Sequence, residues 1–189
     1  AIAAAFKEIE ASSARAVVMT GQGRIFSAGV DLMRLTAGGA EYVRKFLPAL
    51  HKLYDTVFHH PKPVIAAVNG AAAGGGFALV LGSDIRLSAR SAKFNAAFIR
   101  IGLSACDIGT SWVLPRLVGA ARAQELMLTG RVFDAAEAYR IGLVVDVVDD
   151  DTLLDAAITK AHEIMRNTPF GVALTKEGMW EPQTYIDGM

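Results

Sequence analysis

Two glycine-bearing turns carry the clearest chemical signal in the sequence. They are Phe26-Ser-Ala-Gly-Val-Asp-Leu32 and Asn69-Gly-Ala-Ala-Ala-Gly-Gly-Gly-Phe-Ala-Leu79. Each follows an expected buried strand, and the second runs directly into an expected helix. Backbone amides freed at a glycine turn or a helix N-terminus carry partial positive charge. Two such turns at adjacent strand ends can direct two amides at one oxygen and form an oxyanion hole. The same glycines can also serve only tight turns or close packing.

A lone carboxylate, Asp107, is the second candidate for chemistry. It lies in Cys106-Asp-Ile-Gly109, between apolar neighbours. Apolar surroundings raise the pKa of a carboxyl group by desolvation, which suits a residue that takes up and returns a proton. Asp107 is also a suitable N-cap for a helix over 107–117. The sequence leaves both roles open.

Three familiar motifs are incomplete in this chain. The segment Gly21–Phe26 begins like a dinucleotide-binding fingerprint but lacks its third glycine. No Gly-Lys-Ser/Thr sequence is present to form a phosphate-binding P-loop. The segment Gly102–Cys106 resembles a nucleophile elbow around Ser104, but its second glycine is missing and the next histidine is His162. These motifs therefore do not predict the function.

Composition and charge narrow the class of protein. The 189 residues are 52% hydrophobic, with 19 basic against 19 acidic side chains, which predicts one folded domain rather than a disordered chain. The balanced charge argues against a nucleic-acid partner. One cysteine excludes a disulfide framework, and the four histidines lack ligand-like spacing, so we expect no metal site.

No segment is predicted to cross a membrane. The stretch Val64–Gly82 has Asn69 as its only polar side chain, but its five glycines divide it into a strand, a turn and a short helix. We interpret this stretch as buried core. The first ten residues are amphipathic and charged, unlike a signal peptide. We therefore expect a cytoplasmic protein.

Strands and helices are predicted to alternate. Apolar runs predict strands at 16–20, 64–68, 85–89, 93–95 and 144–148. Helical spacing and caps predict helices at 1–10, 41–57, 75–81, 107–117, 120–129, 134–140, 151–167 and 170–180. Asp134 followed by Glu137 forms a capping-box pattern, which favours a structural role for Glu137. The segment 22–35 is predicted as a glycine-containing loop, and no linker divides the chain, so we predict a single domain over 1–189.

Several motifs in order resemble the crotonase (enoyl-CoA hydratase/isomerase) superfamily over nearly the whole chain. They are Gly23-Arg-Ile-Phe-Ser-Ala-Gly-Val-Asp-Leu32, Pro61-Lys-Pro-Val-Ile-Ala-Ala-Val-Asn-Gly70, Gly74-Gly-Gly76, Ser83-Asp-Ile-Arg86, Leu126-Met-Leu-Thr-Gly130, Ala135-Ala-Glu-Ala-Tyr-Arg-Ile-Gly-Leu-Val144 and Asn167-Thr-Pro169. The resemblance implies an α/β fold, a crotonase-like ββα superhelical spiral with a helical C-terminal part. Against that family, the chain lacks the N-terminal hairpin and the last C-terminal helices.

The resemblance also implies the substrate and its contacts. Acyl-CoA thioesters are the implied substrates, with no cofactor, and the amides of Val30 and Gly75 are the implied oxyanion hole. The implied substrate-binding positions are Arg24, Ser27, Ala28, Asp31, Leu32, Ala71, Ala73, Gly74, Ala78, Phe98 and Leu103. Arg34 and Lys62 are further candidates for the CoA groove.

Family members assemble as homotrimers or dimers of trimers, and the resemblance implies the same for this chain. Trp112, Val113 and Leu117 fall on one predicted helix. We expect them to form an exposed apolar face that suits such an assembly.

Two departures from the family pattern bear on the reaction. The glutamates of family hydratases are replaced by Ala78 and Phe98, and neither side chain can transfer a proton. Dienoyl-CoA isomerases and an aryl-CoA dehalogenase of this family carry an aspartate near position 107, which implies that Asp107 is the acid/base. We therefore expect a single-carboxylate enzyme, most simply a double-bond isomerase, that stabilises a thioester enolate. Two alternatives stay open: an enoyl-CoA hydratase (lyase) with unconventional water activation, and an acyl-CoA-binding protein without turnover.

Overall fold

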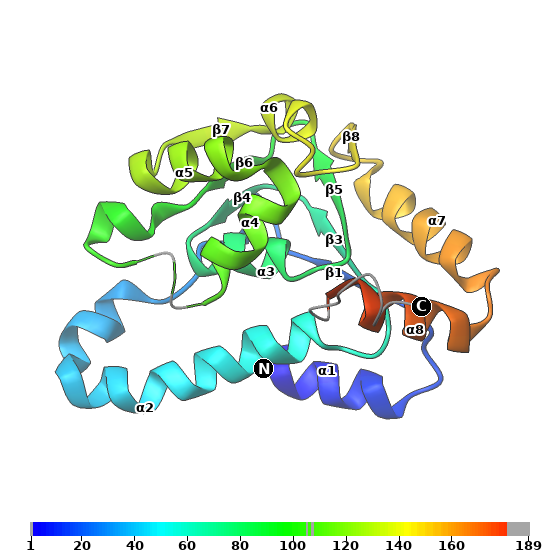
Figure 1. Ribbon diagram of the computed structural model, residues 1–189, viewed down its shortest axis with the longest axis horizontal. Helices are drawn as coiled ribbons and strands as arrows, with labels where there is room; N and C mark the ends of the chain where they lie inside the picture. The colour runs from blue at the N-terminus through cyan, green and yellow to red at the C-terminus, as the bar shows by residue number, and fades with distance from the viewer. Residues whose placement is uncertain (1, 105, 107, 181–189) are drawn as a thin grey trace, which may run out of the picture.

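Two four-stranded sheets lie at the centre of the computed structural model, which describes residues 2–104, 106 and 108–180 (Figure 1). The first sheet has the order β1 (Val17–Thr20), β3 (Val64–Val68), β5 (Ile85–Ala89), β8 (Asp146–Val148), and its neighbouring strands are all parallel. The second has the order β2 (Ile25–Ser27), β4 (Ala71–Ala73), β6 (Lys93–Asn95), β7 (Val132–Asp134). Only the β6–β7 pair in the second sheet is antiparallel.

The chain builds these sheets as a spiral. Each turn gives one strand to each sheet and then a helix: β1, β2 and α2 (Leu32–Phe58), then β3, β4 and α3 (Gly75–Leu81). The third turn is β5, β6, the short 3₁₀ helix η1 (Ala97–Ile101) and α4 (Thr110–Val118). Parallel neighbours require such crossover connections. The predicted ββα spiral is confirmed.

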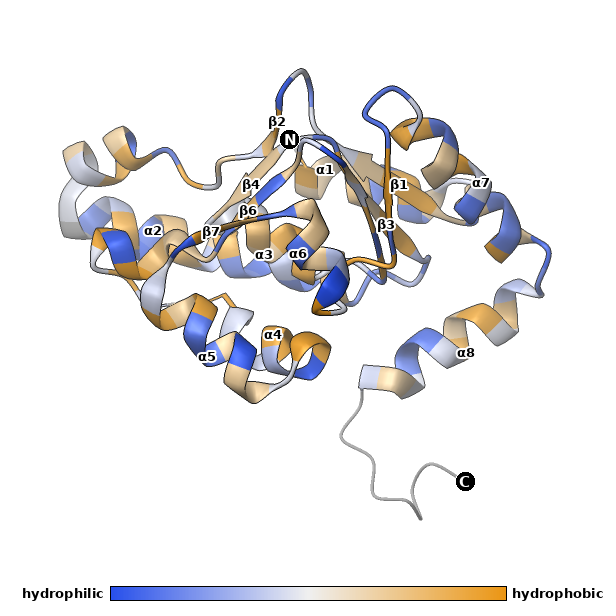
Figure 2. Cartoon of the chain, turned by 90° about the horizontal axis from the view of Figure 1, so that it is seen from above, coloured by the Kyte–Doolittle hydropathy of each residue, from blue (hydrophilic) through white to orange (hydrophobic). Residues whose placement is uncertain are grey.

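Helices cover the spiral and form the C-terminal part. They are α1 (Ile2–Ala11), α5 (Ala120–Thr129), α6 (Ala135–Arg140), α7 (Leu153–Met165) and α8 (Pro169–Trp180). Helix α2 runs beneath the sheets with α1 packed beside it (Figures 1 and 2). The end of α8 contacts α4, where the ring centroids of Trp112 and Trp180 lie 5.7 Å apart. The predicted helical C-terminal part is confirmed.

The core is built from the stretch interpreted as buried. All five residues of β3 and all seven of α3 are buried, because the strand has neighbours on both edges and the helix lies between the sheets and α2. Phe77, Phe94 and Phe133 form an aromatic cluster with ring centroids 5.4–6.3 Å apart. Within the described residues, no helix is both long and apolar enough to span a membrane.

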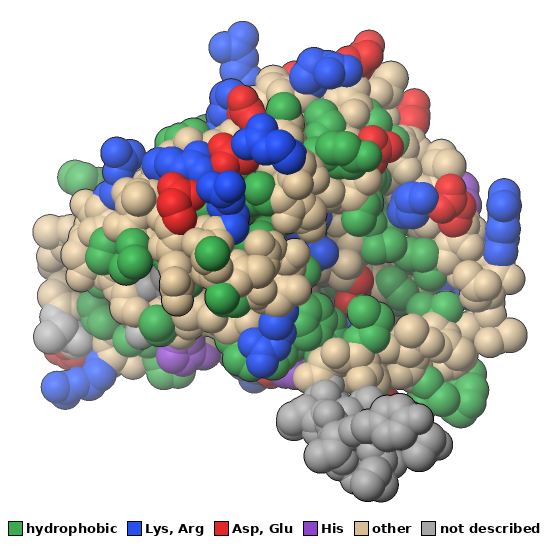
Figure 3. Space-filling view, turned by 45° about the horizontal axis from the view of Figure 1, so that its top comes forward, with side chains coloured by type: hydrophobic (Ala, Val, Ile, Leu, Met, Phe, Trp, Pro, Cys, Tyr) green, Lys and Arg blue, Asp and Glu red, His purple; other side chains and the backbone are tan. Residues whose placement is uncertain are grey.

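An ion-pair network joins β7 to the helices on either side of it. Arg131 contacts Glu125 and Glu137, with both shortest nitrogen–oxygen distances 2.6 Å. Hydrogen bonds from Arg131 hold the pKa of each glutamate below its ordinary value. Asp134 caps α6 as predicted, since it accepts from the Glu137 amide at 2.9 Å. Figure 3 shows basic and acidic side chains interspersed on the face that includes α5 and α6.

Several predicted boundaries were wrong. The segment 22–35 is not wholly a loop, because it contains β2 and the first turn of α2, and Asp31 caps that helix. Strands β4 and β7 were missed. Helix α4 begins at Thr110 with Gly109 as its N-cap residue, rather than at 107. Val113 does not share an exposed face with Trp112: it is 6% exposed, because α4 turns it toward the core.

Candidate active site

The two glycine turns meet backbone to backbone. A Cβ added to Gly29 would lie 2.7 Å from the Gly75 nitrogen and 3.0 Å from the Ala73 carbonyl oxygen, so no side chain fits there. Gly29 also has a φ of 84°, in the left-handed region that favours glycine. The loop after β2 therefore packs directly on the start of α3.

This contact brings the amides of Val30 and Gly75 to the same place. The Val30 nitrogen lies 3.7 Å from the position that a Cβ on Gly75 would occupy. Ser27 Oγ accepts from the Gly29 amide at 3.2 Å, and the Gly74 amide donates to the Asn95 carbonyl at 3.0 Å, so the flanking amides have partners. Among the described residues, neither the Val30 nor the Gly75 amide has a hydrogen-bond acceptor. Two adjacent donors are thus available for one external oxygen.

Tyr54, on α2, holds the Gly75 peptide in position through a hydrogen bond. Its hydroxyl donates to the Gly75 carbonyl at 2.8 Å and would lie 2.5 Å from a Cβ on Gly75. Burial raises the pKa of Tyr54 above its ordinary value of 10.0, which keeps the hydroxyl protonated. Sequence reasoning did not place Tyr54, because its partner is a backbone carbonyl 21 residues away.

An apolar cavity of about 220 Å³ opens beside the two amides, between α2, η1 and the loop after β2. Seven of the predicted site residues line it: Ala28, Val30, Leu32, Gly74, Gly75, Phe98 and Leu103. Helix α2 supplies the opposite wall, with Leu35, Val43, Phe46, Leu47 and Leu50. We call this space the apolar cavity. Its lining suits a short hydrocarbon group.

Ala78 lines a different space, which we call the α2–α4 cavity. It measures about 350 Å³ and is lined by His51, Tyr54, Asp55, Phe58, His59, Ala78, Leu81, Gly82, Ile108, Gly109, Thr110, Trp112 and Val113. Ile108 lines both cavities. The positions of the two missing glutamates, Ala78 and Phe98, therefore fall in adjacent cavities rather than in one.

The other predicted site residues lie around the cavities or serve the fold. Asp31 accepts from the amides of Met33 and Arg34, which makes it the N-cap of α2. Ala71 and Ala73 are in β4, and Arg24 is exposed; none of the three lines either cavity. Asp107 lies outside the described residues.

The two further CoA-groove candidates are also engaged elsewhere. The Lys62 ammonium donates to the carbonyls of Ile9 and Ser12 at the end of α1. Arg34 is exposed and pairs with Asp31 at 3.4 Å. The structure thus gives Lys62 a structural role.

Metal binding has no support in the described part of the chain. No three His, Cys, Asp or Glu side chains there come together in a way that could hold a metal ion.

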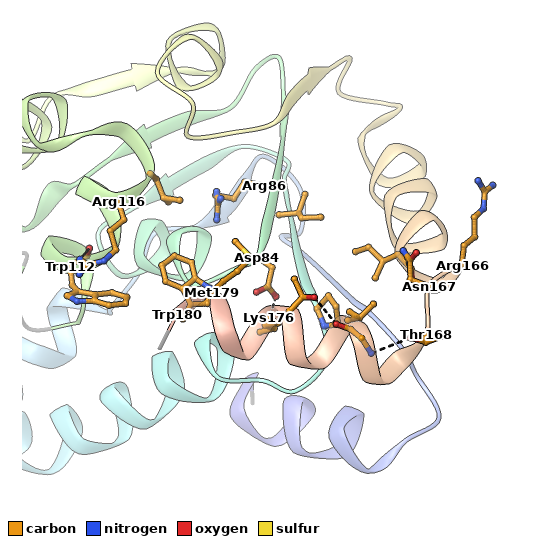
Figure 4. Close-up of a pocket in the computed structure, with 17 residues that line it drawn as sticks. Asp84, Arg86, Trp112, Arg116, Arg166, Asn167, Thr168, Lys176, Met179 and Trp180 are labelled. Atoms are coloured by element: carbon orange, nitrogen blue, oxygen red, sulfur yellow. Dashed lines mark hydrogen bonds and ion pairs between the residues drawn. The ribbon is translucent and has the colours of Figure 1, made fainter. Parts of the chain in front are cut away.

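A larger cleft of about 1290 Å³ lies between α4, β5, α7 and α8 (Figure 4). Asp84 pairs with Lys176 at 2.7 Å and accepts from the Val64 amide at 2.7 Å. Arg86 is buried and donates to the carbonyls of Leu143 and Ser83, and its burial lowers the pKa of its guanidinium to about 10. These charged groups therefore stabilise the start of β5 and its contact with α8, which is a structural role.

Comparisons with known proteins relate the chain to one family. A family model described as enoyl-CoA hydratase/isomerase matches residues 1–185. The chain is 44% identical over 178 residues to the probable enoyl-CoA hydratase EchA12 of Mycobacterium tuberculosis (strain ATCC 25618 / H37Rv), covering 89% of this chain and 62% of that protein. It is 38% identical over 188 residues to the 1,2-epoxyphenylacetyl-CoA isomerase of Escherichia coli (strain K12). This match covers 97% of this chain and 71% of that protein.

The structural match is equally broad. The crystal structure of an enoyl-CoA hydratase from Bacillus anthracis matches with a TM-score of 0.90 at 37% identity, covering 94% of this chain and 69% of that one. The chain spans 62% of the length of the mycobacterial relative.

Proposed function

The chain belongs to the enoyl-CoA hydratase/isomerase family, within the crotonase superfamily, and we propose that it is an acyl-CoA enzyme that stabilises a thioester enolate. The observation that carries this proposal is the pair of free amides at Val30 and Gly75. When a thioester enolises, negative charge gathers on the carbonyl oxygen. Each preorganised donor aimed at that oxygen lowers the barrier by about 3 kcal/mol.

The substrate fits the surroundings of the two amides. With the thioester oxygen between Val30 and Gly75, the apolar cavity receives the chain beside the reacting carbons. The walls from Phe46, Leu47 and Phe98 exclude water, which strengthens the two hydrogen bonds in the transition state.

Proton transfer requires an acid/base group, and the two positions that hold glutamate in family hydratases do not supply one here. Ala78 and Phe98 have no titratable atom, so we assign the acid/base to Asp107 on the basis of the sequence. Its neighbour Ile108 lines both cavities, which supports this assignment. In the isomerase reaction, Asp107 takes a proton from Cα of a 3-enoyl thioester, the oxyanion hole holds the dienolate, and Asp107 returns the proton to Cγ. The product is the 2-enoyl thioester, and no co-reactant is consumed.

Deuterium exchange separates this function from its alternatives. The protein is incubated in D₂O with 2-enoyl- and 3-enoyl-CoA, and the products are followed by mass spectrometry. We expect deuterium uptake with double-bond migration and no added water. A water adduct would instead assign hydration, and binding without exchange would assign a non-catalytic acyl-CoA binder.

The Asp107→Asn variant tests the assigned acid/base. We expect it to bind saturated acyl-CoA as the unmodified protein does and to lose exchange by at least about 10²-fold. Asp149→Asn is the matched control, because Asp149 is an exposed aspartate that pairs with Arg90 at 3.0 Å and lines neither cavity. Equal exchange by both variants would contradict the role of Asp107.

A further inference from the structure

The long helix α2 is interrupted near its start. Gly39 has a φ of 59° and a ψ of −162°, far from helical values, so the helix divides into the pieces 32–38 and 40–58 (Figure 1). Only glycine adopts this backbone conformation readily. A Cβ added to Gly39 would have nothing within 4 Å, so close packing at this glycine does not cause the break. The first piece is therefore a separate short helix.

Few contacts hold this short helix in place. The piece 32–38 is shorter than the about 12–15 residues that an isolated helix needs to be stable in water. Every residue from 31 to 39 is exposed except Leu35, which is half-buried. The side chains of Asp31 and Thr36 form hydrogen bonds only within the segment. In the described chain, no side chain of residues 31–38 forms a hydrogen bond or ion pair with another element.

Two leucines of this piece line the apolar cavity. Leu32 and Leu35 do so together with Leu50, from the second piece of α2, and Phe98, from η1. The Leu32 side chain is nevertheless 44% exposed. An acyl chain in the cavity would cover apolar surface of both leucines, which stabilises the short helix in its packed position. The ligand thus supplies packing that the short helix otherwise lacks.

The start of this piece is attached to the oxyanion hole. Asp31 directly follows Val30, and Gly29 packs on the backbone of Gly75. The short helix therefore connects a closely packed turn to the break at Gly39. Its order can change between these two points while the sheets and the second piece of α2 stay as they are.

We propose that residues 31–38, which we call the lid segment, form a lid on the apolar cavity that is loose in the free protein and becomes ordered over a bound acyl chain. This inference rests on the proposed function. The acyl chain contacts Leu32 and Leu35, and Gly39 lets the lid segment take its closed position independently of the second piece of α2. Coenzyme A without an acyl chain makes no such contact and leaves the lid loose.

Hydrogen–deuterium exchange of backbone amides, followed by mass spectrometry of peptides, tests the lid. The full chain is compared alone, with coenzyme A, and with saturating hexanoyl-CoA, a saturated thioester that cannot isomerise. In the free protein we expect the amides of 33–38 to exchange at least about tenfold faster than those of 44–57. Hexanoyl-CoA should slow exchange at 33–38 by about tenfold, and coenzyme A alone should leave it unchanged.

The Gly39→Ala variant tests the helix break, with Gly119→Ala as the matched control. Gly119, between α4 and α5, has a φ of 80° and a ψ of 155°, which also favours glycine. It too has nothing within 4 Å of an added Cβ, and it lines neither cavity. By calorimetry we expect Gly39→Ala to bind hexanoyl-CoA about tenfold more weakly, because alanine is strained in the closed geometry. Gly119→Ala should stay within about twofold of the unmodified protein.

The outcomes distinguish the lid from the proposed function. Equal exchange at 33–38 and 44–57 in the free protein overturns the lid, and so does binding of hexanoyl-CoA without slower exchange at 33–38. Equal protection by coenzyme A alone, or equal affinity of the two glycine variants for hexanoyl-CoA, also overturns it. All four results leave the acyl-CoA function intact. If the unmodified protein does not bind hexanoyl-CoA, the acyl-CoA function fails and the lid fails with it.

Discussion

The Gly29→Ala variant tests the oxyanion hole directly. The added methyl group would lie 2.7 Å from the Gly75 nitrogen, 3.1 Å from the Gly75 Cα and 3.0 Å from the Ala73 carbonyl oxygen. All three atoms are backbone, so they can yield only by moving the loop after β2 away from α3. The two amides would then separate, and the methyl group would screen the Gly75 N–H.

The expected effect follows from the loss of one donor. Removing a single oxyanion-hole hydrogen bond lowers kcat by about 10²–10³, or about 3–4 kcal/mol. The φ of 84° adds a separate stability penalty of about 1–2 kcal/mol, because alanine is strained in the left-handed region. Both effects are measurable in one protein, by deuterium exchange into an acyl-CoA and by urea denaturation.

Gly23→Ala is the matched control. Gly23 has a φ of 69°, yet nothing lies within 4 Å of its added Cβ. We expect this variant to show only the φ-related stability penalty of about 1–2 kcal/mol, with exchange within about twofold of the unmodified protein. If Gly29→Ala and Gly23→Ala exchange deuterium equally fast while both are folded, the assignment of the oxyanion hole is wrong.

Three further predictions concern the support of the site and the fold. Tyr54→Phe removes the hydrogen bond to Gly75, and we expect kcat to fall about tenfold with KM within twofold, as measured by steady-state kinetics. A parallel loss in both parameters would argue against a positioning role. In Arg131→Met, both paired glutamates lose the partner that lowers their pKa from 4.5. Because lowered carboxyl pKa values stabilise the fold above the unfolded pKa and lose that effect as pH falls through the folded values, the stability difference between Arg131→Met and the unmodified protein should be full at pH 7 and shrink below about pH 4.5 in urea titrations. A difference independent of pH would contradict the network. Phe77→Ala, in the fully buried aromatic cluster, should lower the free energy of unfolding by about 3–5 kcal/mol, and a loss under about 1 kcal/mol would show that the cluster contributes little.

The elements predicted best from the sequence are those with the strongest burial. The apolar run 64–68 and the apolar stretch 75–81 after the glycine turn predicted β3 and α3 at their observed bounds, because continuous burial leaves a continuous apolar pattern. The motif resemblance to the crotonase superfamily is also confirmed by the family match.

The missed strands are short and depend on partners distant in sequence. Strands β2, β4 and β7 have three residues each, too few for a clear period, although β6 is equally short and was predicted at its observed bounds. Ala71, for example, pairs with Ile25 in the neighbouring strand. Such strands exist because another segment supplies their hydrogen bonds, and a local pattern does not carry that information.

Site residues within sequence motifs could be predicted, whereas those whose role depends on tertiary contacts could not. The two glycine turns were recognised from the sequence, and the family resemblance named Val30 and Gly75 within them. The structure brings these two residues together, while their role stays a prediction. Tyr54 carries no motif, and its role comes from the Gly75 carbonyl to which it donates. The role of Asp107 also stays a prediction, because it lies outside the described residues.

The direct packing of Gly29 on Gly75 has a consequence for how this scaffold can change its reaction. An anion site made of backbone amides depends on the two glycines and on the Tyr54 hydrogen bond to Gly75, not on the side chains at positions 78 and 98. Ala78 and Phe98, in adjacent cavities, can therefore be exchanged independently of it and of each other. In the proposed reaction the backbone activates the thioester and the side chains of the cavities determine the fate of the enolate, so substitutions at these side chains can change the reaction while the fold stays the same.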